Sequence, residues 1–206
     1  MSTKERLLET AIHLFAEQGY RDTTIADICS LAKANIASVN YHFGGKDSLY
    51  VEAWKTAFHQ AIKKYPPDGG IAADAPVEAR FRGRITAAIR RITDPECLEF
   101  SIIAKEMANP THLLQDAVEE VVDPFRQAMI DTISEMLGPN CPKEKAQLCC
   151  MSVMSQCLHL MMNRRGHAFK PLNRPAMPAP DALADHIVEF SLGAIRDIRR
   201  SYESQS

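Results

Sequence analysis

The chain has 206 residues, of which 46% are hydrophobic and 24% are charged, and its formal net charge is −2. This composition is typical of a folded globular protein and excludes an intrinsically disordered chain. No apolar run approaches the roughly 18 residues that a membrane-spanning helix needs, and the first residues, MSTKERLLE, are too charged for a signal peptide. We therefore expect a cytoplasmic protein that does not enter a membrane. The net charge alone gives no sign of nucleic-acid binding.

The first predicted helix begins at a capping box, in which Ser2 is followed three residues later by Glu5. The apolar residues after it recur at helical spacing and are Leu8, Ala11, Ile12 and Phe15. Gly19 is the expected end, because glycine accepts the positive φ that often closes a helix. This helix therefore offers one apolar stripe on which shorter helices can pack.

Two short amphipathic segments follow, Thr24–Leu31 and Asn35–Phe43. In the first, Thr24 caps the start with Asp27 as its partner, and the apolar positions are Ile25, Ile28, Cys29 and Ala32. In the second, Asn35 can accept hydrogen bonds from the backbone N–H groups of a new helix. Helices this short need external support. A joint of about three residues predicts a helix-turn-helix, which places its second helix in the major groove of DNA.

A longer helix begins at Lys46 and is predicted to run to about Lys64. One broad face of it is apolar and consists of Leu49, Tyr50, Ala53, Trp54, Ala57, Phe58 and Ala61. The cluster Pro66-Pro67-Asp68-Gly69-Gly70 ends this helix and is the strongest candidate for a domain boundary.

The stretch AKANIASVNYHFGGKDSLY, residues 32–50, resembles the helix-turn-helix signature of TetR/AcrR-type transcriptional regulators. The resemblance extends roughly over residues 2–61, under a third of the chain, and is closest to an AcrR-like subgroup. It implies a DNA-binding domain over residues 1–50, with a linking helix to about residue 64. It also implies a helical ligand-binding and dimerisation domain over residues 51–206. The positions that it assigns to DNA are Asn35, Ile36, Ala37, Ser38, Asn40, Tyr41, His42 and Lys46, and the chemistry of Thr24 and Lys33 adds these two.

The chemistry of these residues fits both base edges and phosphates. Asn40 and Ser38 can hydrogen-bond bases or phosphates, whereas Ile36 or Ala37 can contact a thymine methyl. The resemblance assigns phosphate contacts to Tyr41, His42 and Lys46, and the hydroxyl and N–H of Thr24 also suit a phosphate oxygen. From the sequence alone, His42 could be only a structural histidine and Asn35 only a cap, whereas Val39 and Phe43 belong to the core.

Two departures from the family pattern affect the expected DNA contacts. Lys33 stands where the family usually has glycine in the turn, so it should adopt positive φ at a cost of roughly 1 kcal/mol, and it can contact a phosphate. The recognition helix has no arginine, so the common bidentate guanine contact is absent. Specificity is therefore expected to depend on Asn, Ser, methyl contacts and DNA shape.

Helical periodicity continues through the rest of the chain, and no alternating run predicts a strand. The predicted helices are 77–93, 95–108, 113–137 with Pro124 inside, 143–165 and 181–200. Pro124 could kink or split its helix. The segment 170–180 is a proline-rich loop. The fold class is therefore all-α: a three-helix DNA-binding head, a linking helix and a larger helical domain.

A short recognition helix is too weak alone, so we expect a homodimer on a palindromic, double-stranded operator. The expected dimer helices are the last two, to which the resemblance also assigns dimerisation; the alternative is ordinary monomer core. The residues chosen for this interface are Cys149, Ser152, Gln156, His159, Leu183, Ile187, Phe190, Ser191, Ala194 and Ile198.

The remaining helices are expected to surround a cavity for a small hydrophobic or aromatic effector that releases a repressor from DNA. Methionines suit such a cavity because they adapt to varied apolar shapes. The candidate lining residues, for each of which plain packing is the favoured alternative, are Phe81, Ile85, Phe100, Ile103, Met107, Phe125, Met129, Met154, Leu158 and Met161.

Three alternatives remain open at this point. The six cysteines show no C-x-x-C pair and read as reduced thiols, yet the stretch CCMSVMSQCLHLMM leaves a thiol- or metal-responsive regulator possible. Cys150 and Cys157 lie two turns apart, about 10.5 Å along a helix, too far for one ion.

An enzyme is disfavoured because no catalytic, cofactor or metal motif is present, and the arginines of 80–91 are expected to form a solvated helix face. A helical adaptor without DNA binding is the third class.

Overall fold

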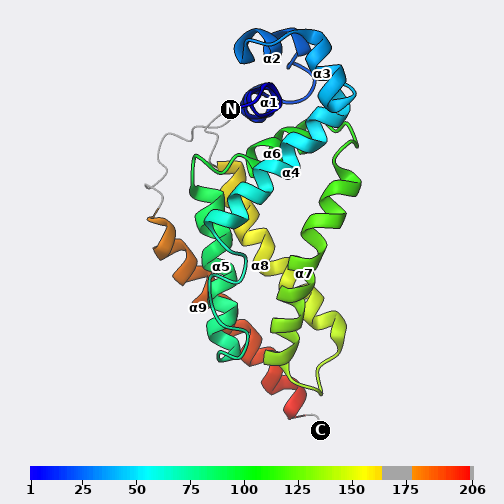
Figure 1. The fold of residues 1–206 in the computed structure, drawn as a ribbon. Helices are drawn as coiled ribbons and strands as arrows, with labels where there is room; N and C mark the ends of the chain where they lie inside the picture. Colours follow the sequence, from blue (N-terminus) through cyan, green and yellow to red (C-terminus); the bar gives the residue numbers. More distant parts are fainter. Residues whose placement is uncertain (164–177, 205–206) are drawn as a thin grey trace, which may run out of the picture. The chain divides into compact units, whose positions relative to one another are not determined.

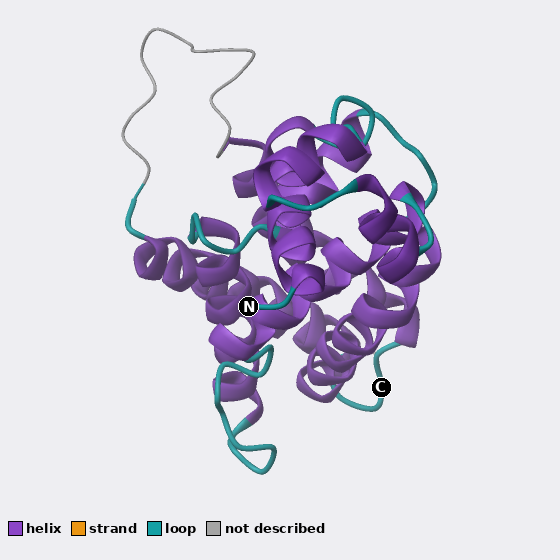
Figure 2. Cartoon of the chain, turned by 45° about the horizontal axis from the view of Figure 1, so that its top comes forward, coloured by secondary structure: helices purple, strands orange, loops and turns teal. Residues whose placement is uncertain are grey.

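The computed structural model describes residues 1–163 and 178–204, with the side chains of 161–163 excepted, and this part of the chain is helical without any strand (Figures 1 and 2). The predicted all-α class is confirmed. The helices are α1 (Thr3–Gln18), α2 (Ile25–Ala32), α3 (Ile36–Phe43), α4 (Lys46–Lys64), α5 (Val77–Thr93), α6 (Glu99–Ala108), α7 (Gln115–Leu137), α8 (Lys143–Asn163) and α9 (Pro180–Glu203).

The helix boundaries largely follow the local signals in the sequence. α1 and α2 both begin with the predicted reciprocal capping boxes. The backbone of α7 stays helical through Pro124, so the proline does not split it. α6 begins four residues later than Pro95, because the chain makes a turn at Pro95 and Glu96 before the helix starts. Most of the predicted proline-rich loop 170–180 lies outside the described residues.

The chain divides into two compact units. The first consists of Met1–Lys64 and Pro95–Val121, and the second of Tyr65–Asp94 and Val122–Ser206. The unit that holds the helix-turn-helix is therefore larger than residues 1–50: it contains all of α4, α6 and the start of α7. No helix of the described residues is long and apolar enough to cross a membrane.

In the first unit, α1 contacts α2, α3, α4 and α6, as the apolar stripe of its sequence predicted for the shorter helices. Phe15 of α1 and Tyr50 of α4 are fully buried and meet edge to face, with ring centroids 4.8 Å apart. Val39 is buried as expected, but Phe43 is only half-buried, so its assignment to the core is wrong. The Lys4 ammonium lies 5.7 Å from the centre of the Phe43 ring, which covers that ring with a cation instead.

A second feature of this unit is a partly buried hydrogen-bond cluster between α4 and the α6–α7 connection. The Tyr50 hydroxyl donates to Glu106 at 3.0 Å, and the backbone N–H groups of Thr111 and His112 donate to the same carboxylate at 2.7 and 3.0 Å. Burial and the neighbouring Glu106 charge raise the pKa of Tyr50, so it stays a donor. Lys55 of α4 also pairs with Glu120 of α7 at 2.7 Å.

In the second unit, α5 contacts α8 and α9, and α8 contacts α9. Phe81 and Ile85 of α5 are fully buried in this core. The predicted boundary loop is a packed turn of this unit. A Cβ on Gly69 would lie 2.5 Å from the carbonyl oxygen of Gly83, so both glycines are needed for the backbones to approach.

Candidate nucleic-acid interface

The turn between α2 and α3 has the backbone that the sequence predicts. Lys33 ends α2 in the left-handed conformation, with φ 50° and ψ 52°, and its side chain is exposed. The Nε–H of Arg6 on α1 donates to the carbonyl of Ala32, the last residue of α2, at 3.1 Å. A cation at a helix C-terminus satisfies a carbonyl that has no partner within the helix. Arg6 therefore holds the turn, a role that sequence reasoning missed.

One face of α3 is exposed. Ile36 is 56% exposed and Tyr41 is 85% exposed, and Ala37 and Asn40 are exposed beside them. Val39 points into the core, which fixes the rotation of the helix. Residues four apart lie above each other on a helix, so these four side chains form one continuous surface, which we name the recognition face. It brings together four of the predicted DNA-binding residues.

The predicted residues Asn35, Ser38 and Thr24 hold the helix starts. The Asn35 side-chain oxygen accepts from both the N–H and the hydroxyl of Ser38, each at 2.8 Å. The Thr24 hydroxyl donates to Asp27 at 2.6 Å and accepts from the Asp27 N–H at 3.1 Å. Both caps, Thr24 and Asn35, are local, which explains why the sequence signals were reliable.

Lys46 is held by an aromatic ring at the start of α4. Its ammonium lies 4.1 Å from the centre of the Tyr20 ring, and partial burial lowers the pKa of Lys46. The Tyr20 hydroxyl in turn donates a short hydrogen bond to Asp47, which raises the pKa of Tyr20 to about 12. His42 is half-buried, and its ring meets that of Tyr41 at 4.9 Å. Lys46 therefore has a structural contact as well as its predicted place at DNA.

One apolar residue beside the recognition face was not predicted. Leu31, in the last turn of α2, is 65% exposed. The signal was present in the sequence, because Leu31 lies outside the apolar spacing of Ile28 and Ala32. An exposed large apolar residue next to other exposed apolar groups commonly marks a binding surface.

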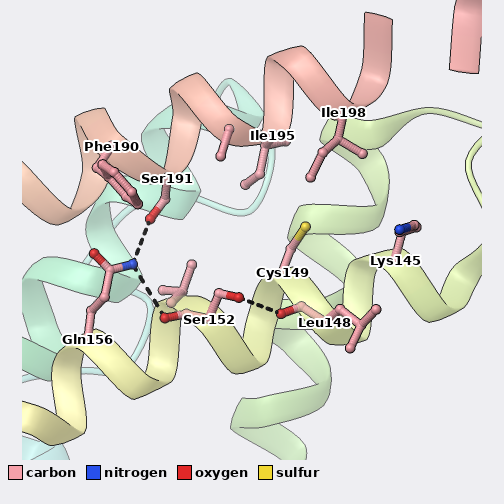
Figure 3. A pocket seen from close by; sticks show the side chains of 11 residues that line it. Lys145, Leu148, Cys149, Ser152, Gln156, Phe190, Ser191, Ile195 and Ile198 are labelled. Atoms are coloured by element: carbon pink, nitrogen blue, oxygen red, sulfur yellow. Dashed lines mark hydrogen bonds between the residues drawn. The ribbon is translucent and has the colours of Figure 1, made fainter. Parts of the chain in front are cut away.

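A second exposed surface lies on α8 and α9, and we name it the α8/α9 surface (Figure 3). Between the two helices runs a groove of ≈ 180 Å³, where Gln156 of α8 donates to Ser191 of α9 at 3.5 Å. Met151 is 60% exposed and Phe190 is 64% exposed at this surface. The predicted dimer residues that line the groove are Cys149, Ser152, Gln156, Phe190, Ser191, Ala194 and Ile198. Among the others, Ile187 is buried and belongs to the core, His159 is exposed, and Leu183 is half-buried.

The predicted ligand residues are divided between the two units. Phe100, Ile103 and Met107 lie on α6, in the first unit, and the others lie in the second. In the second unit, Phe81, Ile85 and Met129 are buried; Phe125 and Met154 are half-buried; and Leu158 is exposed. The side chain of Met161 lies outside the described residues. Helical periodicity selects apolar positions, but it does not say which helices share an interior.

The cysteines of α8 are poor candidates for thiol chemistry. Cys150 and Cys157 are buried, and burial raises the pKa of both thiols, that of Cys157 to about 12. The nucleophile and metal ligand is the thiolate, which a raised pKa disfavours. No group of three or more His, Cys, Asp or Glu side chains in the described part of the chain could hold a metal ion.

The arginines of α5 do not form the single solvated face that the sequence suggested. Arg82 and Arg90 are exposed and pair with Asp185 and Asp181 of α9. Arg80 is largely buried, and it binds Glu135 of α7 at 2.6 Å. The correction follows from the pairing: carboxylates on α7 and α9 draw the arginines onto neighbouring helices.

The chain matches two family models. Residues 7–53 match the model described as bacterial regulatory proteins, tetR family, and residues 77–195 match the C-terminal domain of the HTH-type transcriptional dual regulator CecR. Among curated relatives, the negative regulator IcaR of the biofilm operon icaADBC, from Staphylococcus aureus strain Newman, is 40% identical over 55 residues. That stretch is 27% of this chain and only 30% of IcaR.

Solved structures of similar fold cover nearly the whole chain. A transcriptional regulator from Rhodococcus sp. Rha1 has a TM-score of 0.69 at 16% identity, with 94% of this chain and 96% of that one covered. AibR, in complex with isovaleryl coenzyme A and operator DNA, has a TM-score of 0.70 at 18% identity, covering 92% and 97%. At such identities the likeness shows the fold alone. Since the CecR-type model spans more than half of the chain, the protein belongs to the TetR family of transcriptional regulators, which are not enzymes, with a C-terminal domain of the CecR type.

Proposed function

We propose that this regulator binds a palindromic operator as a homodimer and that a small molecule in its helical domain releases it. The observation that carries the DNA-binding part is the recognition face, Ile36, Ala37, Asn40 and Tyr41. Its side chains are exposed while Val39 anchors the helix in the core. Exposure of Ile36 and Tyr41 does not stabilise the fold, but a helix in a major groove uses such a face.

Phosphate contacts come from the groups around this face. Lys33 is exposed in the turn before α3, and Lys46 lies just after it, at the first turn of α4. The Tyr41 hydroxyl and the His42 imidazole at the end of α3 are further donors. The hydroxyl and N–H of Thr24 both donate to Asp27, so Thr24 takes part mainly by holding the start of α2. Asn35 and Ser38 take part mainly by holding the start of α3.

Dimerisation uses the α8/α9 surface. A single eight-residue α3 reads only a few base pairs, so specific binding needs a second copy. Met151 and Phe190 expose apolar area on helices of 21 and 24 residues, long enough to bury the roughly 800 Å² per partner of a stable interface. Ser152 and Ser191 at the groove are small, which lets helices of two copies approach closely.

The effector is proposed to act on α4. The region matched to the CecR-type domain includes α6 and the start of α7, and these segments are bonded to α4 through Glu106 and Glu120. A hydrophobic or aromatic ligand shifts the equilibrium only if it prefers one arrangement of these helices over the other. AibR was solved with both a ligand and operator DNA, so this fold accommodates both. The name of IcaR, a negative regulator, supports repression.

The test is binding of the purified protein to DNA from its own upstream region over a salt series. We expect specific binding that weakens with salt, and Tyr41→Ala and Lys46→Ala to weaken it roughly tenfold each, since each loses a phosphate contact. Lys63→Ala is the matched control, because Lys63 is an exposed lysine at the other end of α4. Equal losses in Lys46→Ala and Lys63→Ala would show nonspecific attraction only. Absence of any enriched sequence in a genome-wide selection would refute DNA recognition.

Oligomeric state and effector response need their own measurements. Sedimentation of the wild-type protein at micromolar concentration should give a dimer, and a monomer would contradict the proposal. Compounds that raise the melting temperature should then be added to the DNA complex. An effector is expected to release the DNA, whereas ligands that stabilise the protein without changing DNA affinity would contradict the release mechanism.

A further inference from the structure

The recognition face carries chemical information about the DNA that it reads. Its four residues are Ile36, Ala37, Asn40 and Tyr41, and none of them carries a charge at neutral pH. Two are aliphatic, one is a carboxamide and one is a phenol. The exposed face of α3 therefore offers fewer kinds of chemical group for contact with bases than the list of predicted DNA contacts suggests.

The other polar residues of α3 are already engaged. The Ser38 hydroxyl donates to the Asn35 oxygen at 2.8 Å, and the Ser38 N–H uses the same oxygen. Ser38 is also half-buried, so it lies beside the recognition face rather than on it. Among the exposed side chains of α3, the one carboxamide is that of Asn40, and it is not in any of the side-chain hydrogen bonds found for the described residues.

The flanking cations lie outside this face. Lys33 is in the turn before α3, and Lys46 follows Gly44 and Gly45, with its ammonium over the Tyr20 ring. In the major groove, guanine is read mainly by arginine or lysine and cytosine by a carboxylate. Adenine is read by Asn or Gln through N6 and N7, and thymine by apolar contact with its methyl group. The exposed face supplies groups of the last two kinds.

Exposed apolar area points the same way. Leu31 and Ile36 are both more than half exposed on adjoining ends of α2 and α3. Thymine methyl groups are the apolar features of the major groove, so contact with them removes both partners from water.

Resting on the proposed DNA-binding function, we propose that each half-site is read at A·T pairs. Ile36 and Ala37 contact thymine methyl groups, and Asn40 contacts adenine. Guanine and cytosine edges are not read by α3, so lysines contribute to affinity through phosphates without selecting a base.

The first test is selection of operator DNA from a random duplex library with the full-length protein. Each thymine of the enriched half-sites is then replaced singly by deoxyuridine, which removes only the methyl group. We expect about fourfold weaker binding at one or two positions per half-site, the value of one buried methyl. Deoxyuridine in the flanking DNA is the matched control and should leave the affinity unchanged.

The second test assigns the contact to Ile36. Ile36→Ala should bind the thymine and deoxyuridine operators with nearly equal affinity at the sensitive position, so the two changes are not additive. Lys63→Ala, at an exposed residue near the end of α4, should keep the fourfold preference. Circular dichroism melting of both variants checks folding. Likewise, Asn40→Ala should abolish the preference for adenine over 7-deazaadenine.

The outcomes separate the two proposals. An enriched operator with unchanged affinity at every deoxyuridine position overturns the methyl readout, while DNA recognition stands. An enriched half-site whose conserved positions are guanines does the same. If no sequence is enriched, the DNA-binding proposal fails and this inference fails with it. If Ile36→Ala still binds the deoxyuridine operator more weakly than the thymine operator, the assignment of the methyl contact to Ile36 is overturned.

Discussion

The recognition face and the α8/α9 surface both expose large apolar side chains, yet their surroundings differ. On α3, Ile36 and Tyr41 lie beside Asn40, with Lys33 in the preceding turn. On α8 and α9, Phe190 lines a groove together with small and apolar groups, Lys145 and Gln156, and Met151 is exposed on α8. The first surface belongs to an eight-residue helix supported by α1, and the second to two of the longest helices in the described chain.

The comparison teaches that exposed apolar area does not identify a partner by itself. The uncharged side chains of the recognition face, with lysines on either side of α3, match base edges that lie between phosphates. Exposed apolar side chains and small residues on two long helices match another helix pair. The two surfaces should therefore differ in their response to salt. Binding to DNA weakens steeply as ions are added, whereas apolar association does not. Substitutions on one surface should leave the other intact until the dimer itself is lost.

Phe190→Asp should have the largest effect. A carboxylate in place of the phenyl ring that lines the groove of the α8/α9 surface occurs twice in a symmetric dimer. Burying an unpaired charge costs several kcal/mol, so dimer affinity should fall on the order of 100-fold or more. Sedimentation measures the dimer, and DNA affinity should fall with it.

Met107→Asp is the matched control for Phe190→Asp, because Met107 is 63% exposed and lies on α6. It should remain a dimer. A Phe190→Asp protein that stays dimeric at nanomolar concentration would show that the second copy binds elsewhere.

Ile36→Glu should have the next largest effect and should affect only DNA. A carboxylate on the recognition face faces phosphates and thymine methyl groups, so binding should weaken roughly 30- to 100-fold. The side chain is exposed, so the melting temperature and dimerisation should change little. Anisotropy with operator DNA and sedimentation measure the two properties. If dimerisation falls together with DNA binding, the two surfaces are not separate.

Lys33→Gly should separate fold stability from DNA binding. Glycine accepts the left-handed backbone of this position, so the variant should be about 1 kcal/mol more stable. It also loses one cation, so the slope of log affinity against log salt should decrease by about 0.9 for each Lys33–phosphate contact. Chemical unfolding and a salt series measure the two effects. A more stable protein with an unchanged slope would remove Lys33 from the interface.

The helix starts and the left-handed turn could be predicted because their signals are local. Thr24 with Asp27, Asn35 before Ser38, and the special position of Lys33 all depend on residues three or four apart. The predicted apolar face of α4 was buried for the same reason, since periodicity assigns a face without knowledge of its partner.

The rest could not be predicted because it depends on contacts between distant residues. Arg6 binds the carbonyl of Ala32, 26 residues away, and Tyr50 binds Glu106, 56 residues away. No spacing rule connects such pairs, so the sequence did not predict that α6 joins the unit of the helix-turn-helix. For the same reason, the sequence did not show which of the predicted ligand residues share an interior.

Tyr20→Phe should have the smallest effect, and it tests whether the hydrogen bond from Tyr20 to Asp47 stabilises the head. The hydrogen bond to Asp47, then burial and the Asp47 charge, raise the pKa of Tyr20 to about 12. In the unfolded chain the phenol titrates near pH 10. The contribution of this hydrogen bond to stability is therefore complete below pH 10 and is lost as pH rises toward 12, because the unfolded chain loses its proton first.

Urea unfolding from pH 8 to 11.5 should show a steeper loss of stability for the wild type than for Tyr20→Phe. Asp47→Asn, which removes the charge of the acceptor, should flatten the profile likewise. Parallel profiles for all three proteins would show that this hydrogen bond does not stabilise the head.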